Sequence, residues 1–116
     1  MADLLVDTDV LVDHLRTSSG VGRRGDRLAY STITRAELFA GRHVQEEGVR
    51  LLLEPMRELP VDRAVAERAG RIRRDAAIAL PDALIGATAL EHRLGLLTRN
   101  RSHFERVRKL RLHTPR

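Results

Sequence analysis

The sequence predicts an α/β fold in which helical layers cover a mostly parallel central sheet. Short apolar runs alternate with segments of helical periodicity along the chain, and strands separated by helices normally pair in parallel. Residues 82–90 are apolar on nearly every side, which is typical of a helix buried between other layers. At 116 residues the chain suits one domain, expected to span 1–116, with a hydrophobic core of its own.

The first predicted unit is a strand, an acidic turn and a helix. Residues 4–6 form an apolar run too short for a helix, and Asp7 follows at once. Thr8 is a favourable N-cap for the helix that comes next. Its apolar positions have helical spacing and are Val10, Leu11 and Leu15. Asp7 is therefore expected at the carboxyl end of a strand, where α/β proteins build their sites.

The other elements follow from the same periodicities. We expect a loop over 17–27 and strands over 28–31, 96–98 and 110–113, with a short strand or an extended link over 58–61. Helices are expected over 32–42, 46–56, 63–80 and 102–107. Pro81 should begin the buried helix, which Gly95 should close. Glu67 and Arg71 stand four residues apart on the 63–80 helix and should form an ion pair.

Composition restricts the possible functions. The chain has 21 basic and 16 acidic residues, a net charge of +5, and Lys109 is its only lysine. This excess favours a polyanionic partner, although a GC-rich genome also explains the preference for arginine. The absence of cysteine excludes disulfides and thiolate sites and suits a reducing cytoplasm. No apolar run is long enough to span a membrane, and because residues 1–3 lack the basic start of a signal peptide, we expect none.

Three carboxylates fall at predicted junctions, and each also has a structural explanation. Asp7 ends a strand, Glu37 could complete a capping box with Thr34, and Asp82 could favour the dipole of its helix. Asp9 could contact the residues that hold a metal ion without binding the ion itself, or it could only favour the dipole of its helix. Asp7 is the most informative of these acids, because a carboxylate rarely ends an apolar strand unless something positive meets it.

Convergence of Asp7, Glu37 and Asp82 would require a cation or a shared proton. Two carboxylates about 4 Å apart repel by roughly 4 kcal/mol at an effective dielectric constant near 20. That is a large part of a folding stability of about 5–15 kcal/mol. Oxygen ligands without cysteine or a histidine pair favour Mg²⁺ or Mn²⁺, ions that assist phosphodiester hydrolysis.

Four motifs occur in an order that resembles a known family. They are VDTDVLVDHL at 6–15, STITRAELFAG at 31–41, LPDALIGATAL at 80–90 and LLTRN at 96–100. Together they resemble the PIN domain, and specifically the VapC toxins of toxin–antitoxin pairs. The resemblance implies a three-layer α/β/α sandwich and a Mg²⁺- or Mn²⁺-dependent endoribonuclease that inhibits translation by cutting tRNA or ribosomal RNA. It also implies inhibition by a VapB-like antitoxin, a homodimer, and a toxin–antitoxin hetero-oligomer.

The resemblance also assigns roles to individual residues. Asp7 and Asp82 match the main metal-holding acids, and Glu37 matches a further acid that often acts through water. Thr8 and Thr98 match hydroxyl positions beside the site. Asn100 stands where the family usually has a fourth acid, so a second ion should be held more weakly. We interpret His103, which is close by in the sequence, as a surface residue because hard ions prefer oxygen.

The candidates for RNA contact are arginines near the site or in a predicted loop. They are Arg23, Arg24, Arg99 and Arg101. With few aromatic side chains, recognition should depend on RNA shape and backbone.

Other functions are compatible with parts of the sequence. The main alternative is a non-catalytic PIN-like domain that binds RNA or a partner, with Asn100 marking a degraded metal site. An aspartyl-phosphate hydrolase of the haloacid dehalogenase type is disfavoured, because Lys109 lies in the C-terminal basic tract and not near the acids. A metal-free ribonuclease could use only Arg108 and His113, but that spacing is expected by chance in an arginine-rich chain, and His113 falls on a predicted edge strand.

Overall fold

A computed structural model describes all 116 residues and shows one five-stranded sheet in which every strand pair is parallel. The strand order is β3-β2-β1-β4-β5, so β1 lies at the centre. The strands are β1 (Asp3–Val6), β2 (Arg27–Ser31), β3 (Arg57–Leu59), β4 (Gly95–Leu97) and β5 (Leu112–His113). The helices are α1 (Thr8–Thr17), α2 (Thr32–Phe39), α3 (Glu46–Leu53), α4 (Arg63–Ala76), α5 (Leu80–Glu91) and α6 (Arg101–Phe104).

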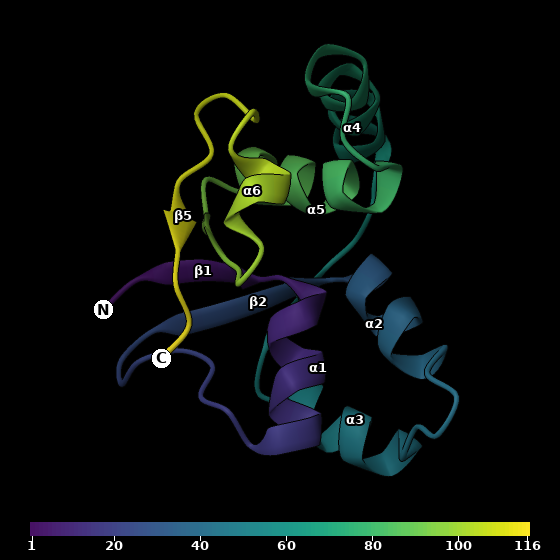
Figure 1. Cartoon of the computed structure of the whole chain (residues 1–116), viewed down its shortest axis with the longest axis vertical. Coiled ribbons are helices and arrows are strands. Elements are labelled where there is room, and N and C mark those ends of the chain that lie inside the picture. The colour runs from purple at the N-terminus through teal and green to yellow at the C-terminus, as the bar shows by residue number, and fades with distance from the viewer.

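The helices cover both faces of the sheet, which confirms the predicted three-layer arrangement (Figure 1). Helices α1, α2 and α3 lie below the sheet in this view, and α4, α5 and α6 lie above it. Alternation along β1 explains this arrangement: Leu4 and Val6 pack with α1 and α3, while Leu5 packs with α5 and α6. All three side chains are buried, so the strand reads as a continuous apolar run.

Helix α5 is buried on two sides, as its sequence predicts. Ile85 and Ala89 pack on the sheet, while Ala83 and Ala87 contact α4. The small side chains let α4 approach α5 closely and form an outer helical layer. No helix of the structure is both long enough and apolar enough to cross a membrane.

Several predicted helix ends are wrong. The helix predicted over 63–80 ends at Ala76, because Ala77 adopts a left-handed conformation and its N–H closes the helix on Arg73 O. The helix predicted over 32–42 ends at Phe39. Gly95 does not close α5 but begins β4, where a side chain would have no room: an added Cβ would lie 2.7 Å from the His113 ring.

The predicted capping residues are also wrong, because their hydroxyls serve tertiary contacts. The N-cap of α1 is Asp7, and Thr8 is the first helical residue. The N-cap of α2 is Ser31, whose hydroxyl accepts from Ile33 N, so no capping box joins Thr34 to Glu37. In the outer layer no ion pair joins Glu67 to Arg71; a pair joins Arg68 and Glu91 instead.

Candidate active site

Asp7 occupies the carboxyl edge of the sheet, where β1 and β4 end side by side. Val6 pairs with Leu97 in the parallel ladder, so the residues that follow these strands become neighbours. The Asp7 N–H donates to Leu97 O at 2.9 Å, and the Thr98 hydroxyl donates to Asp7 Oδ2 at 2.8 Å. Asp7 is only 5 % exposed. The strand pairing therefore holds one buried carboxylate with one orienting hydroxyl.

The environment of Asp7 disfavours its charged form. Burial is the largest cause and raises the pKa of Asp7 from 3.8 to about 6. The bond from Thr98 lowers this pKa, and the negative charges of Asp9 and Asp82 raise it. Asp7 has no cationic side chain as an ion-pair partner. A bound cation would remove this destabilisation, which is the expected property of a metal-holding carboxylate.

Asp82 experiences the same acidic environment from the first turn of α5. Burial raises its pKa, as does the charge of Asp9, while His103 lowers it. His103 Nδ1 lies 3.2 Å from Asp82 Oδ2. His103 was interpreted from the sequence as a surface residue without a role; it is exposed, yet it contacts a predicted site acid. Its only sequence signal is its position three residues after Asn100, in the short helix α6 that follows β4.

Asp9 belongs to the same cluster. Its charge acts on both Asp7 and Asp82, and its carboxylate accepts a hydrogen bond from the Asn100 side-chain amide. The Asn100 N–H in turn donates to the Thr98 hydroxyl at 3.0 Å. Asn100 is thus tied to the site through its amide nitrogen, and its side-chain carbonyl oxygen is left for another partner. The sequence suggested at most a supporting role for Asp9.

Glu37 reaches the site through Thr8. The Thr8 hydroxyl donates to Glu37 Oε1 at 2.7 Å and lies 2.9 Å from the Thr34 hydroxyl. This network fastens α2 to the first residue of α1, directly after Asp7. Glu37 itself is exposed, so a water-mediated role is open to it.

The carboxylates fit a hard divalent ion by donor type, but they are not gathered tightly. No group of three or more Asp, Glu or His side chains is close enough to hold one ion in this conformation. All of the acids nevertheless supply oxygen, and Asp7 and Asp82 both have raised pKa values beside other negative charges. Sharing one ion requires the side chains to move toward each other.

The four candidate arginines lie in different places. Arg99 pairs with Asp13 at 3.0 Å, and Arg101 begins α6, so both adjoin the site. Arg23 and Arg24 lie in the loop that packs on Ala2 at the amino ends of β1 and β2, where Arg23 also donates to Thr114 O. That edge is opposite Asp7. Arg23 and Arg24 could therefore contact RNA only away from the acids.

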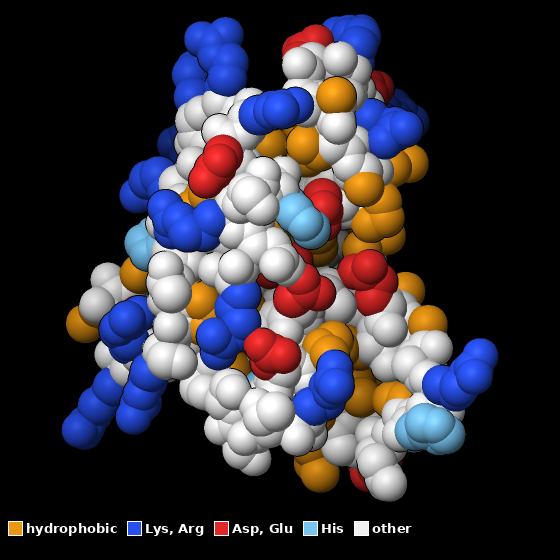
Figure 2. Space-filling view, viewed as in Figure 1, with side chains coloured by type: hydrophobic (Ala, Val, Ile, Leu, Met, Phe, Trp, Pro, Cys, Tyr) orange, Lys and Arg blue, Asp and Glu red, His pale blue; other side chains and the backbone are white.

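Figure 2 shows how the charges are distributed on this face of the molecule. Asp and Glu side chains gather near its centre, over the amino ends of α1 and α2 and toward α6, with a histidine beside them. Lys and Arg side chains surround this acidic centre. Such a distribution suits a cation at the centre and a polyanion that extends beyond it.

The fold and this site define an α/β protein with a carboxylate centre at the carboxyl edge of a parallel sheet. Comparison with known proteins narrows the class. The chain belongs to the PIN-domain family, whose sequence model matches residues 4–110, and within it to the VapC ribonucleases. It is 38 % identical to Ribonuclease VapC10 of Mycobacterium tuberculosis over 120 aligned positions, which cover 93 % of this chain and 90 % of that protein.

Solved structures agree with this assignment. A toxin–antitoxin complex from Klebsiella pneumoniae contains a chain that is 32 % identical, with a TM-score of 0.80 and coverage of 97 % of this chain and 98 % of that one. A chain of VapBC2 from Rickettsia felis, bound to a promoter DNA fragment, is 17 % identical with a TM-score of 0.79. The match covers 98 % of this chain and 99 % of that one. The second likeness concerns the fold alone.

Proposed function

We propose that this VapC ribonuclease is a Mg²⁺- or Mn²⁺-dependent endonuclease that cuts structured RNA, either tRNA or ribosomal RNA, and thereby inhibits translation in the cytoplasm. The observation that carries the proposal is the buried Asp7 carboxylate, which has no cationic partner and feels the charges of Asp9 and Asp82. The net charge of +5 supports a polyanionic substrate.

The residues of the chain would divide the work as follows. Asp7 and Asp82 would hold the ion, with Glu37 and Asn100 contributing oxygen directly or through water. Thr98 orients the Asp7 carboxylate, and Asp9 holds the Asn100 amide in place. A bound divalent ion would activate water for in-line attack on phosphorus and stabilise the leaving oxygen, which leaves a 5′-phosphate.

Cleavage assays with matched variants test this proposal. The native chain is incubated with purified tRNA or ribosomal RNA in Mg²⁺, in Mn²⁺ and in EDTA, beside Asp7→Asn and Asp82→Asn. We expect cleavage only with a divalent ion, products with 5′-phosphates, and loss of cleavage in both variants. Glu54→Gln removes an exposed carboxylate outside the site and should cut normally. Equal cutting by Asp7→Asn, or sustained cutting in EDTA, would contradict the proposal.

We also propose a VapB-like antitoxin as the partner that inhibits this chain. Support comes from the toxin–antitoxin complex of Klebsiella pneumoniae, whose matching chain is 32 % identical and almost fully covered. The expected assembly is a toxin homodimer in a hetero-oligomer with the antitoxin. The product of the neighbouring small reading frame, co-expressed with this chain, should co-purify with it and suppress cleavage; separate elution with undiminished cleavage would contradict the partnership.

A further inference from the structure

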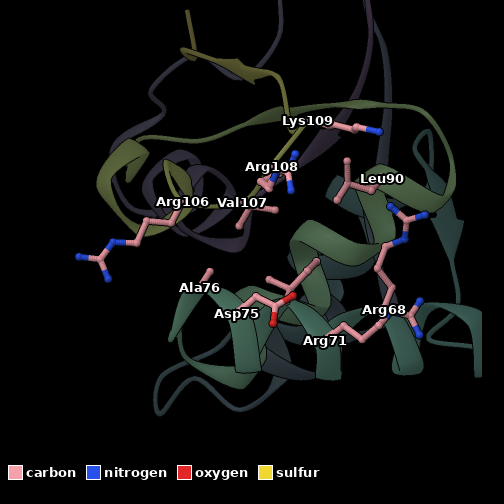
Figure 3. Close-up of a pocket in the computed structure, with 10 residues that line it drawn as sticks. Arg68, Arg71, Asp75, Ala76, Leu90, Arg106, Val107, Arg108 and Lys109 are labelled. Carbon is pink, nitrogen blue, oxygen red and sulfur yellow. The ribbon is translucent and has the colours of Figure 1, made fainter.

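A basic groove lies outside the acidic site, between α4, the end of α5 and residues 106–109 (Figure 3). Its volume is about 410 Å³. Five cationic residues line this basic groove: Arg68, Arg71, Arg106, Arg108 and Lys109. In Figure 3, Arg68 and Arg71 extend from α4, Arg108 and Lys109 lie on the opposite wall, and Arg106 marks one end.

The positive charge of the basic groove is largely uncompensated. Only Arg68 has a carboxylate partner, Glu91, at 2.5 Å; this contact is an ion pair without an aligned N–H hydrogen bond. The one acid of the lining, Asp75, pairs with Arg74 instead. Four cations of the lining therefore have no ion-pair partner, and their mutual repulsion favours an anionic occupant.

Lys109 has an unusual backbone conformation, which matters for the design of the test below. Lys109 is the only lysine of the chain and has φ 68, in the left-handed region that favours glycine. Ser18, Ala77 and Arg93 share this conformation outside the groove, so it does not by itself mark a site. Lys109 contributes a cation to the wall of the basic groove, and because glycine suits its backbone, Lys109→Gly removes that charge without straining the chain.

The basic groove adjoins the acidic site through Arg106. A second hollow of about 510 Å³ is lined by Asp82, His103 and Arg106, so one arginine borders both surfaces. A strand that places a phosphodiester at Asp82 can continue past Arg106 into the basic groove. Leu90 and Val107 provide apolar surface in the groove for sugars or bases.

We propose that the basic groove binds the RNA backbone on one side of the scissile bond. This inference rests on the proposed ribonuclease function and adds to it a separate phosphate-binding surface. An acidic protein segment would suit the charge of the groove equally well. However, its carboxylates would gain nothing from continuing into the acidic site, whereas a phosphodiester chain suits both surfaces when a cation is bound.

Binding of the full chain to purified tRNA, measured in EDTA over a range of NaCl concentrations, tests this inference. The groove variant is Arg108→Ala with Lys109→Gly. The control variant is Arg57→Ala with Arg93→Gly, at the amino edge of the sheet. Both variants remove two exposed cations that have no ion-pair partner, and both replace one residue of positive φ, because Arg93 has φ 56. Because glycine adopts positive φ readily, neither glycine substitution should lower the stability of the chain.

The groove variant should weaken binding and reduce the slope of log affinity against log salt by about 1.4 to 1.8, since each phosphate contact contributes about 0.7 to 0.9. The control should keep the native slope. Equal slopes in both variants would overturn the inference, as would groove-dependent binding of polyglutamate with unchanged RNA binding.

Parallel cleavage assays separate the groove proposal from the proposed ribonuclease function. If the wild-type chain cuts RNA, Asp7→Asn does not, and the groove variant keeps the wild-type salt slope, then only the groove proposal is refuted. If RNA binding depends on the groove but the wild-type chain does not cut RNA, then only the proposed ribonuclease function is refuted.

Discussion

Replacing Asp7 with asparagine should abolish RNA cleavage and yet stabilise the metal-free chain. Burial raises the pKa of Asp7 from 3.8 to about 6, so the folded chain binds this proton more tightly than the unfolded chain does. The stabilisation from that proton is complete below pH 3.8 and is lost as the pH rises through about 6. Each pKa unit corresponds to about 1.4 kcal/mol, so ionised Asp7 costs the fold about 3 kcal/mol at pH 7.

The substitution Asp7→Asn is nearly isosteric and keeps an oxygen that can accept from the Thr98 hydroxyl. Urea unfolding in EDTA, followed by circular dichroism, should show a free energy of unfolding higher by about 3 kcal/mol at pH 7 and by about half of that at pH 5. Glu54→Gln, an exposed substitution of the same kind, should change stability by less than about 0.5 kcal/mol.

Mg²⁺ or Mn²⁺ should reverse the order of the two proteins. The ion should bind the unsubstituted protein and not Asp7→Asn. It should therefore raise the free energy of unfolding of the unsubstituted protein and leave that of Asp7→Asn unchanged. The reasoning would be refuted if Asp7→Asn were less stable than the native chain at pH 7. It would equally be refuted by a gain of the same size at pH 5 and pH 7, because the cost would then not come from ionisation.

Three further substitutions test the packing and the hydrogen bonds of the site. Thr98→Val removes the hydroxyl that donates to ionised Asp7, so the pKa of Asp7 should rise further. The free energy of unfolding at pH 7 should fall by about 2 kcal/mol, and the acid limb of the pH profile of cleavage should move to higher pH. Gly95→Ala brings a Cβ to 2.7 Å from the His113 ring and should destabilise the chain by roughly 1–3 kcal/mol in thermal unfolding, with partial rescue by His113→Ala. Glu37→Gln should leave stability unchanged and slow cleavage by about 10- to 100-fold in single-turnover assays; an unchanged rate would exclude Glu37 from the site.

Much of the site could be predicted because its acids follow directly from short-range patterns. A buried parallel strand needs an apolar run, so Asp7 after residues 4–6 is recognisable as a strand-end acid. Pro81 before Asp82 similarly marks the first turn of a helix. The two capping predictions failed, and both concern hydroxyls. Thr8 and Thr34 have the chemistry of capping residues, and only the packing of α1 on α2 shows that they bond to each other.

The sequence alone determined the layers of this protein and which carboxylates lie at the ends of its elements, because apolar periodicity reports burial residue by residue. Only the tertiary structure decided which polar groups meet. Thr98 donates to Asp7, and Asn100 to Asp9, each across 91 residues, because β4 happens to pair with β1. The contact of His103 with Asp82 depends on the packing of α6 beside α5, and the basic groove depends on the packing of α4 against α5. Local periodicity carries no information about which strands become neighbours, and that choice builds the site.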